Sequence, residues 1–409
     1  MKHIFLITLV ICVCFAQEIT FPQIKFTPSE KRINTQSFGF KLAFTVSMNG
    51  RRMGQKRQEY RQISTKEELI LATDKNYVTK VKAKYRNAQV TGTNGRLQRM
   101  PISGKEYLIT AQNGNVDATY PNGRKPYLPQ EIQLVGMDYH TLGKDNAFSN
   151  IFAGNTFAAG KVLEIPTPAV KALLGENLSV KSMTCTVKET RVVNDKPCLI
   201  LDATADISIP MGKFVMDCKL SGEMAVRLDT SEVISSTLLG PITLDSQVAT
   251  PQGNAHVKGQ GTAGISIGIT FDGLLGCIDA MQNNPKADHV SLSLKVQRLV
   301  KHKDSKLLPK DAYAKIFLQH AKSENPRVRA FIARSINSVE HQPEFVEIIT
   351  QYLQDEEKEI AKGAAYSCSR SKDLLQPQVK EILRKLYEEE EKQAKPDRTF
   401  LNWLGRCLK

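Results

Sequence analysis

Hydrophobic and polar residues alternate with a period of two along most of the chain between residues 20 and 300. Short runs of this kind recur there and are separated by turn-forming residues. Successive side chains of a strand point to opposite faces, so the alternation predicts antiparallel strands with one face in water. The predicted strands cover residues 40–46, 77–90, 179–192, 197–209, 213–228, 232–244, 262–271 and 289–299.

Four Asn-Gly pairs interrupt the first part of this pattern. Asparagine and glycine adopt the positive φ angles that a two-residue hairpin turn requires, so each pair predicts a hairpin. The pairs are Asn49-Gly50, Asn94-Gly95, Asn113-Gly114 and Asn122-Gly123. Hairpins join neighbouring antiparallel strands, and the pattern therefore predicts a meander.

Two short helical segments lie inside the strand-rich part. Residues 167–174 carry a proline near their start and are followed by Gly175, which typically ends a helix, and a helical turn is expected at 274–281. We expect one broad, curved antiparallel sheet, or two related sheets divided near residue 150. A sheet of this size tends to curl and to leave a concave face. The candidate inward residues are Leu42, Phe44, Val46, Val81, Ala83 and Tyr85.

From residue 307 the hydrophobic period changes to 3.6, which is typical of amphipathic helices. Two segments repeat: residues 325–336 (NPRVRAFIARSI) align with residues 357–368 (EKEIAKGAAYSC), and residues 397–408 form a looser third copy. Such a repeat predicts helix pairs that stack on one another. The predicted helices cover residues 310–322, 326–337, 343–354, 358–370, 375–390 and 397–408.

This helical tail resembles HEAT repeats. The resemblance rests on Asn325-Pro326-x-Val328-Arg329 followed by Ala330 and Ala333, with Ile360 and Ala364-Ala365 at the matching places. It covers about 100 residues, and in the third copy Trp403 replaces Phe331. The resemblance implies a scaffold or protein-binding surface without shared catalytic residues. The strand-rich part carries no comparable resemblance.

The first sixteen residues have the layout of a secretory signal peptide. Lys2 supplies the positive start, residues 4–13 form an apolar stretch, and Ala16 is the small residue before the expected cleavage site. The stretch is too short for a stable membrane anchor, and no later apolar run reaches about 18 residues. We therefore expect an exported protein, periplasmic or extracellular, that is not an integral membrane protein.

Removal of this leader leaves six cysteines, which an oxidising compartment allows to form disulfides. No two form a C-x-x-C pair, which removes zinc-ribbon and thioredoxin-type interpretations. Around a hairpin turn predicted at Asn194-Asp195, Cys198 faces Arg191 and Cys185 faces Thr204, so these two cysteines are poor partners. Disulfides and isolated buried thiols both stay open for Cys185, Cys198, Cys218, Cys277, Cys368 and Cys407.

The chain has 56 Lys+Arg against 42 Asp+Glu, and the excess lies near its start. Residues 17–110 carry 18 basic and 7 acidic residues, whereas residues 305–409 carry 19 and 16. A basic surface attracts anionic lipid, acidic polysaccharide or an acidic protein, although lysines also protect exposed edge strands. Nucleic acid is a poor candidate because no reading motif occurs. The candidate anionic-partner surface consists of Arg51, Arg52, Lys56, Arg57, Lys80, Lys82 and Lys84.

Motifs for enzymatic chemistry are missing or stand in the wrong context. Residues 259–264 match G-x-G-x-x-G and residues 264–268 match G-x-S-x-G, but the strand alternation continues through both. We expect a glycine-relieved bend or bulge there, with Ser266 as an ordinary strand residue. Asp288 and His289 are adjacent, and Asp202 and Asp206 share a strand face, as pairs of catalytic residues can. Such pairs are common by chance, so they do not indicate a catalytic role. We expect no cofactor, no metal site and no catalytic residue.

The sequence thus predicts an α+β protein. Its parts are a signal peptide at 1–16, a basic antiparallel β region at 17–150, a second part of the β region with short helices at 151–304, and a HEAT-like helical repeat domain at 305–409. Our hypothesis is an exported, non-enzymatic binding or scaffold protein of the cell envelope. Its β region would bind a lipophilic or anionic ligand, and its helices a protein partner. A hydrolase assembled from distant residues and a purely structural surface protein stay open as alternatives.

Overall fold

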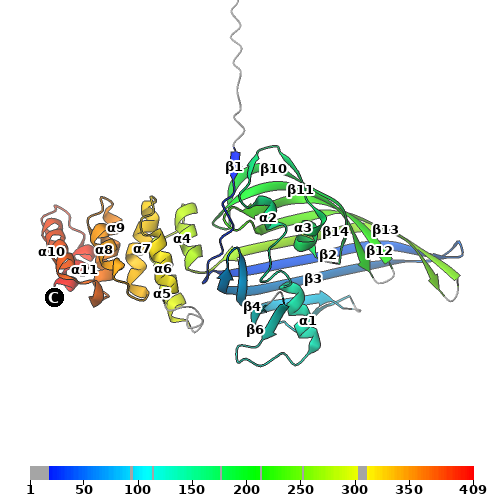
Figure 1. Cartoon of the computed structure of the whole chain (residues 1–409), viewed down its shortest axis with the longest axis horizontal. Helices are drawn as coiled ribbons and strands as arrows, with labels where there is room; N and C mark the ends of the chain where they lie inside the picture. The colour runs from blue at the N-terminus through cyan, green and yellow to red at the C-terminus, as the bar shows by residue number, and fades with distance from the viewer. Residues whose placement is uncertain are drawn as a thin grey trace, which may run out of the picture.

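The computed structural model describes residues 18–92, 95–112, 115–175, 177–211, 214–250, 253–302 and 311–409. A large sheet is followed by a row of helices, and the two parts lie end to end along the long axis of the molecule (Figure 1). This arrangement confirms the predicted α+β class with a helical tail. The predicted signal peptide and the Asn113-Gly114 turn lie outside the described residues, as does Asn94.

Twelve of the described strands form one sheet in the order β7-β6-β4-β3-β2-β14-β13-β12-β11-β10-β9, with β5 attached to β4. All its neighbouring strands are antiparallel. The first long strand, β2, pairs with the last, β14, at the centre of the sheet. The strands are β2 (Lys31–Met48), β3 (Arg51–Asp74), β4 (Tyr77–Thr91), β5 (Leu97–Arg99), β6 (Glu106–Gln112), β7 (Asn115–Thr119), β9 (Val162–Glu164), β10 (Ser179–Val193), β11 (Lys196–Met211), β12 (Phe214–Arg227), β13 (Val233–Thr250) and β14 (Gly253–Phe271), and β1 (Glu18–Thr20) pairs separately with β8 (Thr156–Ala158).

Two of the predicted hairpin turns have the backbone conformation that their residues favour. Asn49 and Gly50 have φ angles of 47° and 79°, and Asn194 and Asp195 have φ angles of 51° and 64°. Positive φ at both central residues is the requirement of the type I′ turn, whose twist matches that of the paired strands. These turns join β2 to β3 and β10 to β11.

A β-bulge shifts the register of the β10–β11 hairpin away from its turn. Cys185 lies opposite Ala203 instead of Thr204. The pairing slips between Val187 and Glu189, so a count outward from the turn is wrong by one residue beyond that point. The six described cysteines are all free and buried, as small hydrophobic side chains would be.

One face of the sheet, which we call the inner face, carries the larger β core. The sheet curls, so that residues of distant strands enter one hydrophobic cluster: Phe40 of β2, Ile207 of β11 and Leu220 of β12. Helices α2 (Ser149–Phe152) and α3 (Thr167–Leu174) contribute to the same cluster. The α3 helix has the predicted bounds.

A second, smaller core lies between β4, β6, β7 and the helix α1 (Pro129–Asp138). The hydrophobic pattern did not predict α1, whose Val135 belongs to the same cluster as Tyr85 and Tyr107. The candidate inward residues are therefore divided between two cores. Leu42, Phe44 and Val46 belong to the inner-face core, and Val81, Ala83 and Tyr85 belong to the second core.

The predicted helices of the tail are present within a few residues of their expected ends. Among the described residues, no helix has the combined length and hydrophobicity of a membrane-spanning segment. The helices are α4 (Leu274–Asn283), α5 (His289–Lys301), α6 (Ala312–His320), α7 (Pro326–Ser335), α8 (Glu344–Leu353), α9 (Lys358–Cys368), α10 (Pro377–Glu391) and α11 (Arg398–Leu408).

The strand predicted at residues 289–299 is wrong, because this segment forms α5. Asp288 caps the helix by accepting hydrogen bonds from the backbone N–H groups of Val290 and Ser291. The residues packed against the helical core are Leu292, Val296 and Val300, which recur every four positions. Apolar residues alternate at the start of the segment, which is the pattern of a strand. The buried Ser293 is polar, so the buried side of the helix does not appear as a continuous hydrophobic stripe.

The helices α5, α7, α9 and α11 form one row, in which small residues allow close packing. The hydroxyl oxygens of Ser293 and Ser335 lie 2.8 Å apart between α5 and α7. A Cβ atom on Gly363 of α9 would lie 3.0 Å from Cβ of Ala333 and 3.1 Å from the carbonyl oxygen of Ala330 in α7. The row therefore begins at α5, whereas the first repeat found in the sequence corresponds to α7.

Replacing Gly363 by alanine should destabilise the helical tail by about 1–3 kcal/mol, because the added methyl group overpacks the α7–α9 contact. Gly405→Ala on α11 is the matched control. Its nearest neighbour outside the helix is Cε2 of Tyr387 at 3.6 Å, an ordinary contact, so the helix propensity of alanine should stabilise it by up to about 1 kcal/mol. Urea unfolding followed by the fluorescence of Trp403 measures both. An unchanged midpoint for Gly363→Ala would contradict the packing argument.

Candidate functional site

A pocket of about 310 Å³ lies between α3 and the inner face, and we call it the α3 pocket. Its apolar lining comes from α3, the loop after it, β2, β11 and β14. Several of these large side chains are only partly buried even though they pack on the core. The apolar lining residues are Phe38, Leu173, Leu174, Leu178, Ile207, Ile209, Ile265 and Ile267.

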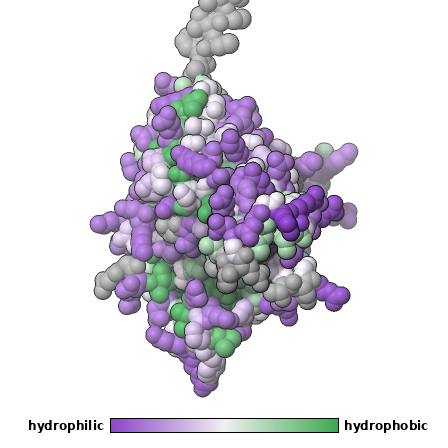
Figure 2. All heavy atoms as spheres, turned by 90° about the vertical axis from the view of Figure 1, so that its right-hand side faces the viewer, coloured by the Kyte–Doolittle hydropathy of each residue, from purple (hydrophilic) through white to green (hydrophobic). Residues whose placement is uncertain are grey.

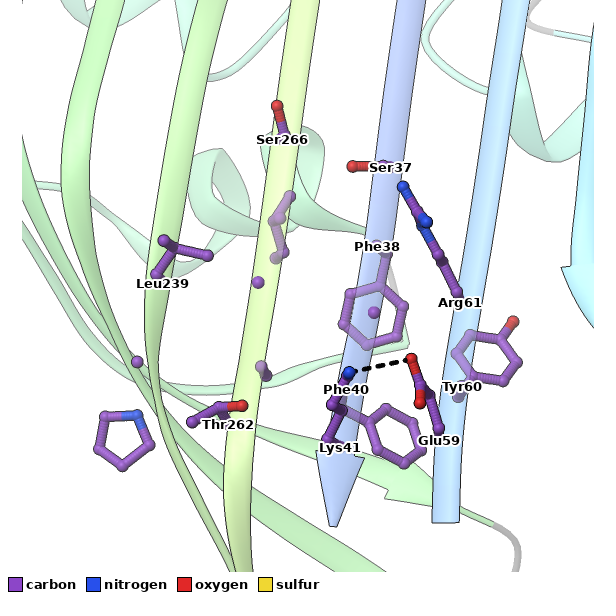
Figure 3. A pocket seen from close by; sticks show the side chains of 16 residues that line it. Ser37, Phe38, Phe40, Lys41, Glu59, Tyr60, Arg61, Leu239, Thr262 and Ser266 are labelled. Atoms are coloured by element: carbon purple, nitrogen blue, oxygen red, sulfur yellow. Dashed lines mark ion pairs between the residues drawn. The ribbon is translucent and has the colours of Figure 1, made fainter. Parts of the chain in front are cut away.

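A second pocket, of about 830 Å³, lies where β13, β14, β2 and β3 run side by side, and we call it the four-strand pocket (Figure 3). Leu239, Gly264, Gly39 and Arg61 lie opposite one another across these four strands. Leu239 is 60% exposed on the outer face. Phe38, Phe40 and Tyr60 of the inner face also line the pocket. The lining residues that it has in common with the α3 pocket are Ser37, Phe38, Ile265 and Ser266.

The end of the molecule that carries the long hairpins is hollowed. Figure 2 looks onto this end and shows a depression with hydrophobic residues at its bottom, bordered by projecting hydrophilic side chains. The inner-face aromatics lie in close contact: the rings of Phe40 and Tyr60 stack with centroids 5.5 Å apart, and those of Phe38 and Tyr60 lie 5.9 Å apart. The β region thus combines a curled sheet with partly open apolar surface.

One end of the α3 pocket is polar. It is lined by Gln36 of β2, Gln62 and Ser64 of β3, and Asp138 at the end of α1. The hydroxyl oxygen of Ser64 is buried and has no hydrogen-bond partner among the described residues. Buried polar atoms normally have partners, so this oxygen is free to bond to a bound molecule or to water.

A buried ion cluster continues from this polar end toward the base of the sheet, by which we mean the end next to the helices. Nζ of Lys66 lies 3.4 Å from Oε1 of Glu68 and 3.5 Å from Oδ2 of Asp138. Arg32 donates to Oε2 of Glu68 at 2.8 Å, and the hydroxyl group of Tyr139 donates to Oε1 at 2.5 Å. Glu68 therefore receives hydrogen bonds or ion-pair contacts from three side chains.

These contacts keep both signs of charge ionised inside the protein. Burial favours the neutral form of Glu68, but the cations Lys66 and Arg32 outweigh it and lower the pKa of Glu68 to about 2. Burial likewise disfavours charged Lys66, yet the carboxylates of Asp138 and Glu68 raise the pKa of Lys66 above its ordinary value.

A second part of the ion cluster joins the sheet to the helices. Arg227 at the end of β12 lies 2.9 Å from Oε2 of Glu30 and donates to Oδ2 of Asp229 at 2.7 Å. Lys196 of β11 is paired with Asp279 of α4, and its Nζ lies 3.8 Å from Oε2 of Glu30. These charges lie at the junction of the two parts of the molecule and do not line the α3 pocket.

The predicted basic residues fall into two separate groups. Arg51, Arg52, Lys56 and Arg57 are exposed on the projecting part of β2 and β3, residues 41–61, which we call the arm. The arm carries six basic residues and one acidic residue, Glu59. Among the described residues, β3 pairs with β2 alone until Gln62, where β4 begins to pair.

Two of the three β4 lysines lie among acidic side chains instead, and Lys80 lies opposite Thr110 of β6. Lys82 is buried and forms an ion pair with Glu106 of β6. Lys84 lines a pocket of about 250 Å³ together with Glu67, Glu68, Glu106 and Lys82. The structure therefore does not bring these lysines together with the arm residues.

The motifs that sequence analysis discounted lie in ordinary structural settings. Residues 259–268 belong to β14, which pairs with β2 and β13 there without a register shift, so the expected bulge is not present. A Cβ atom on Gly261 would lie 1.8 Å from the carbonyl oxygen of Lys41, so close backbone approach explains this glycine. Asp202 forms an ion pair with Lys188.

An aromatic and basic ridge crosses the helical tail. The guanidinium carbon of Arg334 in α7 lies 4.3 Å from the ring centroid of Tyr366 in α9 and 5.3 Å from that of Trp403 in α11. Tyr366 and Trp403 meet edge to face at 5.3 Å. Arg334 and Tyr366 occupy the same position of their repeats, which places them side by side in the stack.

The α3 pocket was not predicted from the sequence as a defined site. Its lining residues come from α1, α3, β2, β3, β11 and β14, which are far apart along the chain. None of the six candidate inward residues lines this pocket, although Ile207, Ile209, Ile265 and Ile267 lie in strands that the sequence predicts. The curl of the sheet decides which residues meet there.

Comparison with known proteins identifies the tail. The family of HEAT repeats matches residues 314–395, so the C-terminal region contains HEAT repeats. No curated protein matches the chain significantly. Among solved structures, lipovitellin, described for its lipid–protein interactions, is 12% identical with a TM-score of 0.29; the match covers 89% of this chain but only 42% of that one.

Two further solved structures are still more distant. The complex of the pilotin AspS and the secretin GspD from ETEC is 8% identical, with a TM-score of 0.14. The match covers 71% of this chain and 61% of the matched chain of that complex. The outer membrane protein OprG from Pseudomonas aeruginosa is 9% identical, with a TM-score of 0.09. The match covers 60% of this chain and 97% of OprG. None of the three likenesses is close enough to support an argument about fold or ligand.

Replacing Glu68 by glutamine should destabilise the protein by about 3–5 kcal/mol at neutral pH, because it leaves buried cations without their carboxylate. The pKa of Glu68 is lower in the folded protein than in the unfolded chain. Its contribution to stability is therefore complete above pH 4.5 and is lost as the pH falls toward 2. Urea unfolding at several pH values should show a shallower acid dependence for Glu68→Gln than for the wild type. Glu67→Gln, which removes a pair with the half-exposed Arg86, should cost at most about 1 kcal/mol.

Replacing Arg51 and Arg52 of the arm by serine should reduce retention on a polyanion column more than replacing Lys80 and Lys84 of β4. The reason is that Lys84 shares its pocket with Glu67, Glu68 and Glu106, whereas the arm has a large surplus of positive charge. Each double variant loses two positive charges. A difference between them in the salt concentration at elution therefore reports where on the protein the charges lie. Equal shifts would show that only net charge matters.

Proposed function

We propose that the chain is a non-enzymatic binding protein of the cell envelope or extracellular space. Its β region holds a lipophilic ligand in the α3 pocket, and its HEAT repeats bind a protein partner. The observation that carries the ligand-binding proposal is the partly open apolar lining between α3 and the inner face. Leu173, Leu174, Leu178, Ile209 and Ile265 surround this space without filling it.

Large apolar side chains that remain partly exposed around a concavity are characteristic of ligand sites. A volume of about 310 Å³ is at the lower end of the range for small-molecule pockets, enough for a single alkyl chain or a small aromatic probe. A small apolar ligand is therefore favoured.

The ridge of Arg334, Tyr366 and Trp403 supports the proposed protein partner. Tryptophan, tyrosine and arginine dominate the energetics of protein interfaces, and these three are only partly buried. They lie on consecutive helices of the row α7, α9 and α11, so a partner can contact them together. The basic arm gives a second surface, suited to anionic groups. The export part of the proposal rests on the signal-peptide pattern at residues 1–16.

The double variant Leu174→Gln, Ile265→Gln should bind N-phenyl-1-naphthylamine, an apolar probe that fluoresces in hydrophobic surroundings, at least about tenfold more weakly than the wild type. Loss of two apolar contacts in the pocket removes more than the 1.4 kcal/mol that corresponds to this factor. Leu294→Gln is the control, because Leu294 is 47% exposed on α5, away from the pocket. Wild-type affinity in the double variant would contradict the proposed site.

A further inference from the structure

The inner-face side chains change from apolar to charged along the strands toward the helical end of the sheet. Phe38 lies opposite Gln62, Gln36 opposite Ser64, and Asn34 opposite Lys66 in three successive inner-face rows across β2 and β3. The α3 pocket spans the first two rows, and a smaller polar pocket of about 150 Å³ begins at Gln36 and continues past Lys66. A ligand that fills the α3 pocket therefore meets apolar walls at one end and hydrogen-bonding groups at the other.

The groups at the polar end include both an acceptor and donors. Asp138 lines both pockets, and its Oδ2 accepts a hydrogen bond from Tyr85 at 2.8 Å. The carbonyl oxygen of Gln62 already accepts a hydrogen bond from Tyr60 at 3.0 Å, which leaves its amide group to donate. Ser64 adds a buried hydroxyl oxygen without a partner among the described residues.

The cations near this end are already engaged by carboxylates. Lys66 lies between Glu68 and Asp138, and Arg32 donates to both Glu68 and Glu232. In the polar pocket, Asp138, Glu68 and Glu232 are matched in number by Arg32, Lys66 and Lys144. Among the residues that line the α3 pocket, however, Asp138 alone is charged. An anionic headgroup in the α3 pocket would lie beside the Asp138 carboxylate and be repelled by it.

From this arrangement, and on the assumption that the proposed function is correct, we infer that the α3 pocket selects a single-chain lipid with an uncharged hydroxyl headgroup. A hydroxyl group can donate to the Asp138 carboxylate and accept from the Gln62 amide at the same time. A carboxylate can only accept, so it offers Asp138 no further donor and brings two like charges together. The alkyl chain would lie against Leu173, Leu174 and Ile265.

The inference is tested by displacing N-phenyl-1-naphthylamine from the full-length protein with dodecanol or with dodecanoate at pH 8. The two compounds have equal chain lengths and differ in the headgroup. Dodecanol should displace the probe at a concentration at least about tenfold lower than dodecanoate. Equal displacement, or a preference for dodecanoate, would overturn the headgroup assignment and leave the lipophilic site intact. If neither compound displaces the probe, the proposed function itself fails.

Two variants locate the selectivity. Asp138→Asn should bind dodecanoate at least about fivefold more tightly, because the repelling charge is gone, and should bring the two affinities together. Gln62→Leu should weaken dodecanol binding severalfold; Gln62 is only partly buried, so this variant serves as the test if Asp138→Asn fails to fold. Persistence of the full dodecanol preference in a folded Asp138→Asn variant would overturn the assigned role of Asp138.

Discussion

The buried ion cluster at the base of the sheet is the constraint on which the rest of the structure depends. Glu68 holds Arg32 and Lys66 on neighbouring strands, and Glu30 holds Arg227 and lies beside Lys196. Burying charges is costly unless each has partners, so the elements that carry them must come together in one arrangement. The cluster thereby fixes how β2, β3, β11 and β12 curl around the inner face.

The same cluster links the sheet to the helical tail. Lys196 reaches Asp279 of α4, whose apolar residues Leu274 and Cys277 belong to the core of the HEAT repeats. The turn between β10 and β11 adds a hydrogen bond from Asn283 to the carbonyl oxygen of Asp195, at 3.0 Å. A ridge on α7, α9 and α11 is consequently held at a defined position relative to the pockets of the β region. A partner bound to the repeats would therefore have the α3 pocket at a fixed position relative to it.

Local patterns predicted most of the elements, because alternation, turn residues and the helical period are properties of neighbouring residues. The type I′ turn at Asn49-Gly50 and the end of α3 at Gly175 are examples. The failure at α5 has the opposite origin, since its buried stripe includes Ser293, a small polar residue that packs against Ser335. Hydrophobicity alone does not reveal such a contact. The α3 pocket was beyond local reasoning because Leu174 and Ile265 are brought together only by the curl of the sheet.

Pairing of β2 with β14 has a consequence for how the protein is made. The strands that meet at the centre of the sheet are separated along the chain by about two hundred residues, as is the Arg32–Glu232 contact beside them. Contacts between such distant segments form late, after a large loss of chain entropy. During synthesis the N-terminal hairpin must wait, with one edge unpaired, for β14 to emerge. An unpaired edge of this length invites association with other chains, so correct assembly of this sheet depends on keeping the nascent strands apart from one another.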